Sequence, residues 1–520
     1  MRKLGYLVLL LQSGVTVLAF YGLLRFDNTH LDLSLFKDPY LQAIIGFSLK
    51  QAVLSSVLSV TLGLMIARLL YYTPHLWAKN LFLTLCLLCF VLPSFVLITG
   101  LVVLLGQSGW LTPYLGESWN LYGLKGILIA HVFLNMPYVV RVIYLHLNQI
   151  PASSWMLARQ LKLSRWEKIK YLEWGALKAT ITYLLGFIFI LCFNSFAVVL
   201  ALGGGPQATT LELAIYQALK YSFNLSEAVT LAWLQCAIAG GALLFIIRFN
   251  KFNWLSPTNN KIAYLPEIHN SKKFLAYLLY TLLWLILLLP LLALLPESIS
   301  VNWKDFAFKG LLEAVGTSLA LSFISAVSSL FLAYFILLLM RYARKATNKY
   351  QKIWLDFLAN QHMVAPTMVL STGIYIYLLN KIDIEQWGVF VLILLNTLLI
   401  LPFILQNIRT SLLSYDDQYV RLVSVLKLSF RVKVFLEFRA LQPVVVHALI
   451  VGILLVLGDI AVFALFGNKE WSTLPWLIYS YIGSYKLSEA SLVSTIFLLL
   501  CLFLVLQMDK HNKDIGSNHA

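Results

Sequence analysis

The chain of 520 residues has little charge, because Asp, Glu, Lys and Arg make up only 12% of it, about half the share in soluble domains. Its five cysteines all lie in apolar runs, which excludes a disulfide scaffold; Cys86 and Cys89 are interpreted as small packing residues. No G-x-x-x-x-G-K-[ST] motif occurs, and no catalytic grouping of acids, histidines or a nucleophile. The sequence therefore predicts no enzyme activity, cofactor or metal site in this chain.

Apolar residues are abundant instead, at 60% of the chain. They form runs of about 20 residues with few charges, the length that crosses a bilayer as a helix. Barrel strands would alternate in polarity, and these runs do not. We predict an all-α integral membrane protein with about twelve transmembrane helices, near residues 4–24, 45–68, 81–106, 122–147, 178–202, 228–247, 274–295, 314–340, 356–379, 387–408, 442–466 and 489–508.

Positive charge is unevenly distributed among the loops. Lys and Arg concentrate before the first span, after the last span and in every second loop, whereas the other loops carry acids such as Glu212 and Asp383. Cytoplasmic loops are the ones enriched in Lys and Arg, so both termini are expected in the cytoplasm. This topology accounts for much of the net charge of +16. We therefore expect contact with membrane lipid and no nucleic-acid partner.

The sequence contains an internal duplication. Leu161–Ser164 recurs as Leu426–Ser429, and Glu173-Trp174 recurs as Glu437-Phe438, about 265 residues later. Further matches follow in the same order along both halves. Because six spans separate the copies, both have the same orientation, as in other transporters with parallel repeats. The predicted architecture is two parallel six-helix repeats.

Two long basic loops, near residues 148–177 and 409–441, correspond in this duplication. Apolar residues recur at helical spacing in the first loop, and Arg and Lys lie between them. This pattern predicts a short amphipathic helical segment. Such a segment can lie in the lipid interface or dock on a soluble partner, and its repetition in both loops favours docking.

Both loops resemble the cytoplasmic coupling loop of permease subunits of type I ABC importers. Lys162 and Lys427 stand where that family has a glycine. The resemblance implies a helix that sits in a groove of a cytoplasmic ABC ATPase subunit, with two such subunits that use the ATP. It assigns the coupling role to Leu161, Lys162, Leu163, Ser164 and Glu173 in the first loop and to Leu426, Lys427, Leu428, Ser429 and Glu437 in the second.

A second resemblance covers nearly the whole chain. Leu202–Leu219, with its three consecutive glycines, resembles the bacterial thiamine transport permeases, as do Glu173-Trp174 and Cys192–Ala197. It implies a permease subunit in the bacterial inner membrane that imports thiamine and its phosphates, delivered by a periplasmic thiamine-binding protein. The alternatives are a fused ferric-iron ABC permease and, after it, an ion-coupled secondary transporter.

The resemblance also divides the chain into domains. They are a first transmembrane helix with its periplasmic loop (1–43), a first ABC permease domain (44–248), a linker with the seventh helix and a periplasmic loop (249–312), a second ABC permease domain (313–508) and a cytoplasmic tail (509–520).

Two polar residues, Asn194 and Asp459, lie inside predicted spans at equivalent positions of the duplication. An ionisable residue in a span is costly and usually faces a cavity or a polar partner. One hypothesis is that both side chains make helix–helix hydrogen bonds. The other is that they line the translocation path, where a carboxylate would favour a cation such as thiamine.

Overall fold

The computed structural model describes residues 2–25, 38–205, 208–249, 273–304, 306–345, 349–363, 366–379, 381–426, 429–468 and 471–517. These residues form helices and turns, with no strand among them, which confirms the predicted all-α class. The helices before residue 250 are α1 (Arg2–Arg25), α2 (Pro39–Tyr72), α3 (Lys79–Val91), α4 (Ser94–Leu105), α5 (Thr112–Leu115), α6 (Leu124–Leu147), α7 (Ala152–Gln160), α8 (Arg165–Glu167), the π-helix η2 (Lys168–Glu173), α9 (Trp174–Phe193), α10 (Phe196–Leu202), α11 (Leu211–Lys220) and α12 (Leu225–Phe249).

The second half of the chain follows with a similar series. Its helices are α13 (Lys273–Ile299), α14 (Phe308–Lys345), α15 (Lys349–Ala359), the 3₁₀ turn η5 (Gln361–Met363), α16 (Thr367–Leu378), α17 (Ile384–Val425), α18 (Phe430–Leu457), α19 (Ala461–Phe466), α20 (Leu474–Gly483) and α21 (Leu487–Ser517).

Within the described ranges, nine helices are long and apolar enough to cross a membrane, or ten if the bent pair α3–α4 is one span. Two of the twelve predicted spans are not among them. The segment 228–247 lies in α12, whose side chains are described only in part. The prediction of one continuous span over 356–379 is wrong, because the helix is interrupted after Ala359 and only the 12-residue α16 resumes. The total of twelve spans stays a prediction.

Proline explains two of the interruptions. The predicted span 81–106 is broken at Leu92-Pro93, where α3 and α4 meet at an angle of 101°. Proline has no N–H to donate, and its ring pushes the preceding residue out of the helical region; Leu92 is accordingly extended, with φ −60° and ψ 129°. Pro366 stands in the same position before α16.

Two further predicted spans are also divided. The span 178–202 ends its first helix at Phe193 and resumes as α10 after Asn194 and Ser195. The span 442–466 ends its first helix at Leu457 and resumes as α19. Each half of the chain therefore holds two broken helices at matching places in its sequence.

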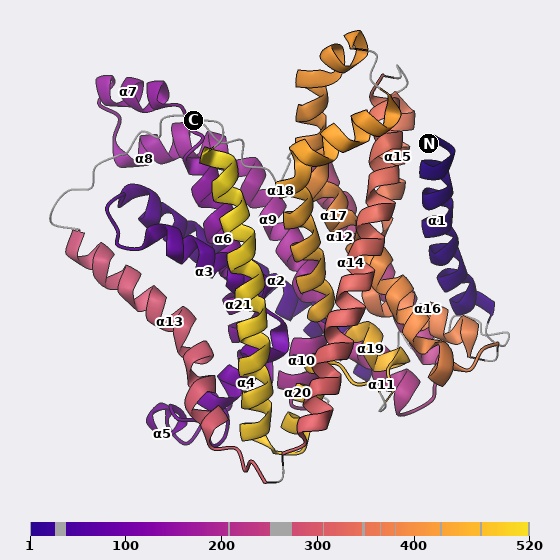
Figure 1. The fold of residues 1–520 in the computed structure, drawn as a ribbon. Coiled ribbons are helices and arrows are strands. Elements are labelled where there is room, and N and C mark those ends of the chain that lie inside the picture. The colour runs from indigo at the N-terminus through magenta and orange to yellow at the C-terminus, as the bar shows by residue number, and fades with distance from the viewer. Residues whose placement is uncertain are drawn as a thin grey trace.

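The long helices run between two ends of the molecule (Figure 1). The N- and C-terminal ends of the described chain lie at one end together with α7 and α8, and we call this the terminal end. The short helices α10, α11, α19 and α20 gather toward the opposite end.

The two halves interlock through their first helices. α1 packs along α16 of the second half, and α13 packs along α4 of the first half. Glycine permits both crossings: a Cβ atom on Gly22 would lie 2.2 Å from the carbonyl oxygen of Gly373, and one on Gly100 would lie 2.1 Å from that of Pro290. Because lipid is as apolar as leucine, such close backbone packing holds membrane helices together.

Rows of small polar residues serve the same purpose within each half. Four buried serines lie along the face of α2 that packs on neighbouring helices, and four lie along α14: Ser48, Ser55, Ser56, Ser59, Ser318, Ser322, Ser325 and Ser329. The most extensive helix pairings of the two halves are α2 with α6 and α14 with α17. Each serine allows close approach and can bond to a backbone carbonyl.

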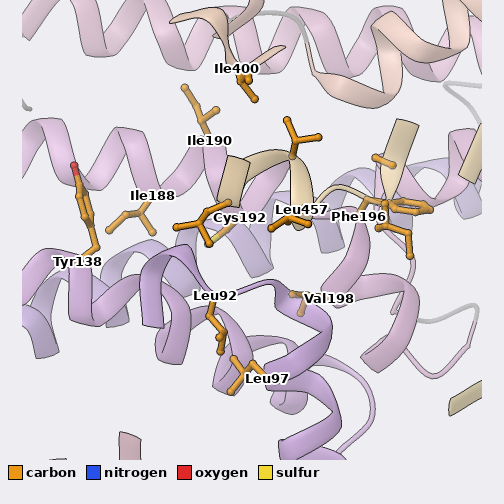
Figure 2. Close-up of a cluster of buried hydrophobic side chains, with 14 of the residues drawn as sticks. Leu92, Leu97, Tyr138, Ile188, Ile190, Cys192, Phe196, Val198, Ile400 and Leu457 are labelled. Atoms are coloured by element: carbon orange, nitrogen blue, oxygen red, sulfur yellow. The ribbon is translucent and has the colours of Figure 1, made fainter. Parts of the chain in front are cut away.

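Side chains from both halves meet in the centre of the molecule. Figure 2 shows Leu92 and Cys192 of the first half close to Leu457 of the second, with Ile400 above them. All four are buried, so the broken ends of α3, α9 and α18 share one apolar core.

Candidate functional site

The helix breaks lie against one another at this centre. A Cβ atom on Gly458, which ends α18, would lie 3.6 Å from the Cα atom of Pro93, which begins α4. The amide of Gln51 on α2 donates to the carbonyl oxygen of Cys192 near the end of α9, at 2.9 Å. Half-helix ends that meet within a membrane bring free backbone groups together, and such places hold substrates in other transporters.

Asn194 ends α9 and is half-buried. Its side-chain oxygen accepts a hydrogen bond from the amide of Gln235 on α12, at 3.3 Å. This is the helix–helix contact of the first hypothesis. A role of Asn194 in the translocation path stays a prediction.

Asp459 occupies the matching break in the second half and is also half-buried. Its carboxylate accepts a hydrogen bond from the backbone N–H of Ala461 at 3.2 Å, so it caps the start of α19. It also lines a cavity of about 10 Å³ together with Ser318, Asn396 and Thr473, enough room for about one water molecule. Asp459 thus makes a structural contact and also faces an opening.

Glu212 was predicted in a loop between two spans, and that prediction is wrong because the residue lies in a helix. Glu212 lies in the first turn of α11, with no part of the residue exposed. Neither carboxylate oxygen has a hydrogen-bond partner among the described residues. One sign of this burial is visible in the sequence, because Leu211 and Leu213 flank Glu212 and the helix continues as an apolar stretch.

The first predicted coupling loop is a folded unit at the terminal end (Figure 1). α7 closes with two backbone hydrogen bonds, from Lys162 N–H to the Arg159 carbonyl and from Leu163 N–H to the Ala158 carbonyl, at 3.1 and 3.0 Å. This pattern requires a left-handed residue, usually glycine, at the position of Lys162. Lys162 has φ +49°, so the lysine adopts the conformation that the family's glycine would supply.

Ser164 begins the next turn of this loop. It receives a hydrogen bond from the backbone N–H of Glu167, and its own N–H donates to the Glu167 carboxylate at 2.7 Å. This reciprocal capping box starts the helical run that leads into α9. Leu161 stands between the two caps, where 62% of its surface is exposed.

The second predicted coupling loop is described only in part. Leu426 lies just after α17 with 56% of its surface exposed, and Ser429 is the N-terminal cap residue of α18. Lys427 and Leu428 lie outside the described residues. An exposed leucine is therefore present at the same position of both loops.

Glu173 and Glu437 were assigned to the coupling loops by resemblance. Both glutamates are buried, and each forms an ion pair with an arginine of a long helix, either α2 or α14. Glu173 pairs with Arg68 of α2 at 2.8 Å and receives the hydroxyl of Tyr72. Glu437 pairs with Arg341 of α14 at 2.8 Å. In this structure the two carboxylates fasten their loops to the membrane helices.

Proteins of known family resemble this chain along most of its length. A family model described as "Binding-protein-dependent transport system inner membrane component" matches residues 59–250. The chain is 37% identical to the thiamine transport system permease protein ThiP of Haemophilus influenzae, over 90% of this chain and 88% of the relative. It is 34% identical to that of Escherichia coli, over 92% and 90%. The chain belongs to the thiamine transport permease family.

A relative of lower identity is named for ferric transport. The putative ferric transport system permease protein FbpB 1 of Haemophilus influenzae is 23% identical, over 69% of this chain and 59% of the relative. Thiamine transport permeases are inner-membrane components of ABC importers, and this chain is accordingly a multi-pass inner-membrane permease subunit. Permeases of this kind associate with an ATPase and a binding protein.

Proposed function

We propose that this chain is the membrane-spanning subunit of an ABC importer that moves thiamine and its phosphates from the periplasm to the cytoplasm. The observation that carries the proposal is the identity of 34–37% to thiamine permeases over about nine-tenths of the chain. The ferric relative shares 23% over a shorter stretch. A fused ferric-iron permease is the alternative that this difference disfavours.

The chemistry of the centre supports an organic cation as substrate. Among the described residues, no group of three His, Cys, Asp or Glu side chains could hold a metal ion. Asp459 is a single carboxylate at its helix break, and one carboxylate suits a delocalised monovalent cation better than a small metal ion that demands several ligands.

Both termini and both coupling loops lie in the cytoplasm in this proposal. The terminal end carries the Lys- and Arg-rich segments.

The two halves act as two copies of one unit, and a contact that occurs in both halves supports this. Ser48 caps the first N–H of α11 at 3.0 Å, and Ser318 caps that of α20 at 2.8 Å.

Two ATPase subunits, one on each coupling loop, supply the energy. Leu161 and Leu426 insert into the grooves of these subunits, and the turn from Lys162 through Ser164 shapes the contact of the first loop. Lys427, Leu428 and Ser429 take the corresponding roles in the second loop. The Arg68–Glu173 and Arg341–Glu437 pairs pass the motion of the loops to α2 and α14. ATP binds to these partners and not to this chain.

Uptake in intact cells tests the substrate. A strain that lacks the gene is compared with the same strain carrying it, with labelled thiamine at submicromolar concentration and with energy depletion as control. We expect energy-dependent thiamine uptake only when the gene is present. Unchanged thiamine uptake in the deletion strain, with lost ferric-iron uptake, would transfer the chain to the iron permeases.

Thiol labelling tests the orientation. Ser164 and Ser429 are both exposed. Cysteines placed at these positions should be protected from a membrane-impermeant reagent added outside the cell, and should react after permeabilisation. Exposed Glu117, on the connection between α5 and α6, provides the matched site that should react from outside. Labelling of either loop from outside would rule out this orientation.

A further inference from the structure

An open groove lies beside the short loop that joins α2 to α3. Its volume is about 500 Å³, which is within the range of ligand-binding pockets. Residues 74–76 and 78–81 line it, together with Tyr144 of α6. None of these described lining residues is acidic, and Lys79 is among them. The groove therefore offers a positive charge without a negative one, and it suits an anion.

Lys79 is held in place, but its charge is not neutralised. Its Nζ atom donates to the carbonyl oxygen of Leu70 at 2.6 Å and lies 4.6 Å from the centre of the Tyr144 ring. It makes no ion pair among the described residues. A carbonyl group and an aromatic ring orient an ammonium group without cancelling its charge, and an ammonium group has three N–H donors. Lys79 can therefore still bind a negatively charged partner.

Aromatic rings place this loop at the level of the lipid headgroups. Half of the Trp77 surface is exposed, and its ring stacks on that of Trp284 of α13, with 5.4 Å between the ring centres. The hydroxyl of Tyr280 donates to the carbonyl oxygen of Trp77 at 2.9 Å. Trp and Tyr concentrate where a membrane meets water. Leu81 lines the same groove with 56% of its surface exposed, so the groove has an apolar wall beside its charged end.

The second half of the chain balances its charge at the matching place. Counted along the duplication, Leu83 and Tyr144 correspond to Asp356 and Arg409. Asp356 and Arg409 form an ion pair at 2.9 Å. The cavity that they line measures about 110 Å³. The second half thus supplies its own negative partner, whereas the first half leaves a larger space and a lysine for a partner from outside the chain.

We propose that the groove beside Lys79 binds one anionic phospholipid of the cytoplasmic leaflet. The phosphate of the lipid lies against the ammonium group of Lys79, and its hydrocarbon chains pass Leu81 toward the membrane core. A free phosphate ion has the same charge but would leave the apolar wall uncovered. The choice of leaflet follows from the orientation proposed above, whereas lipid binding itself depends on neither that orientation nor the substrate.

Native mass spectrometry of the full-length permease in detergent micelles tests the site, with phosphatidylglycerol or phosphatidylcholine added as the probe. We expect one phosphatidylglycerol to bind more tightly than phosphatidylcholine. Lys79→Gln should weaken this binding about fivefold, the worth of one lysine at a lipid surface, and Lys79→Arg should retain it. Lys178→Gln, at an exposed lysine of α9 outside the groove, is the matched control and should leave the binding unchanged.

A second variant and a second probe keep the test decisive. Asn80→Asp brings a carboxylate into the groove without changing Lys79, and should abolish the preference for phosphatidylglycerol even if Lys79→Gln does not fold. Equal binding of the two lipids by the unaltered permease, or unchanged binding in these variants, would overturn the proposal. Inorganic phosphate is added in a separate arm. Displacement of the bound phosphatidylglycerol by millimolar phosphate would assign the groove to free phosphate instead of a lipid.

Discussion

Arg68 in the first half pairs with one carboxylate, Glu173, which also accepts the Tyr72 hydroxyl. Arg341 in the second half pairs with two carboxylates, Glu437 and Asp416. Measured from the capping serines Ser48 and Ser318, Arg341 stands about one turn further along its helix than Arg68. Both pairs tie a coupling loop to a long helix, and the second pair is reinforced by an additional charge.

The helix that leads into the predicted coupling loop is interrupted in the first half and continuous in the second. In the first half, Pro151 separates α6 from α7, because proline cannot donate within a helix and disfavours helix before it. In the second half, the matching residue of the duplication is Asp416, and α17 continues over 42 residues. The difference between Pro151 and Asp416 at this one position thus affects both the course of the backbone and the charge around Arg341.

The centre of the molecule shows the same contrast. Asn194 of the first half corresponds to Asp459 of the second, and Glu212 corresponds to Pro475. Contacts that hold the frame recur in both halves, while the carboxylates at the centre do not. We infer that the contacts present in both halves serve a mechanical task that the two halves share. The predictions below test this inference.

The largest effect is expected at the two exposed leucines of the coupling loops. Leu161→Asp or Leu426→Asp would bury an unpaired charge against an ATPase, at a cost of roughly 3 kcal/mol, or about 100-fold in the dissociation constant. The double variant should lose transport. Co-purification of the ATPase with the permease measures the effect.

Tyr114→Asp on α5, at the opposite end of the molecule, is the matched control and should retain the ATPase. Normal ATPase binding by the double leucine variant would show that the loops do not carry the coupling.

Arginine removal should affect the halves unequally. Arg341→Ala leaves two carboxylates without their partner and should destabilise the chain by about 3 kcal/mol. Arg68→Ala leaves one carboxylate that keeps the hydroxyl of Tyr72, and should cost about 1–2 kcal/mol. Unfolding in mixed detergent micelles measures both. Equal losses would contradict the asymmetry of the two anchors.

The serine caps should affect the halves equally. Ser48→Ala and Ser318→Ala each leave one buried N–H unpaired, that of Leu211 or Leu474. Each change should cost about 1 kcal/mol, in the same unfolding measurement. A difference well beyond the error between the two variants would mean that this contact is not a shared part of the frame.

The smallest effect concerns Lys162. Because its φ of +49° is left-handed, Lys162→Gly should stabilise the loop by up to about 1 kcal/mol. Arg159→Gly, in the last turn of α7, is the control and should destabilise by a similar amount. Loss of stability in Lys162→Gly would show that the lysine makes a contact that outweighs its backbone strain.

Hydropathy could predict where the chain crosses the membrane, because each window of apolar residues reports the solvent around it. It could not predict the breaks at Asn194 and at Gly458-Asp459, since an apolar run has the same composition whether it is straight or divided. The Leu92-Pro93 sequence did carry a signal for the first break.

The candidate site was predicted less completely than the fold. Asn194 and Asp459 could be singled out, because polar residues in apolar runs are conspicuous. Glu212 was missed, since α11 is a helix of only ten residues and reads as a loop beside the long spans. The exposed leucines of the coupling loops followed from resemblance and helical spacing, whereas the burial of Glu173 and Glu437 depends on arginines more than 90 residues away.

ATP hydrolysis by the assembled complex tests the central claim most directly. The purified permease with its ATPase, in lipid vesicles, is mixed in turn with thiamine-loaded and with ferric-loaded binding protein, and the hydrolysis rate is measured. The account predicts that thiamine-loaded protein stimulates hydrolysis and that ferric-loaded protein leaves it at the basal rate. Stimulation by the ferric-loaded protein alone would contradict the account.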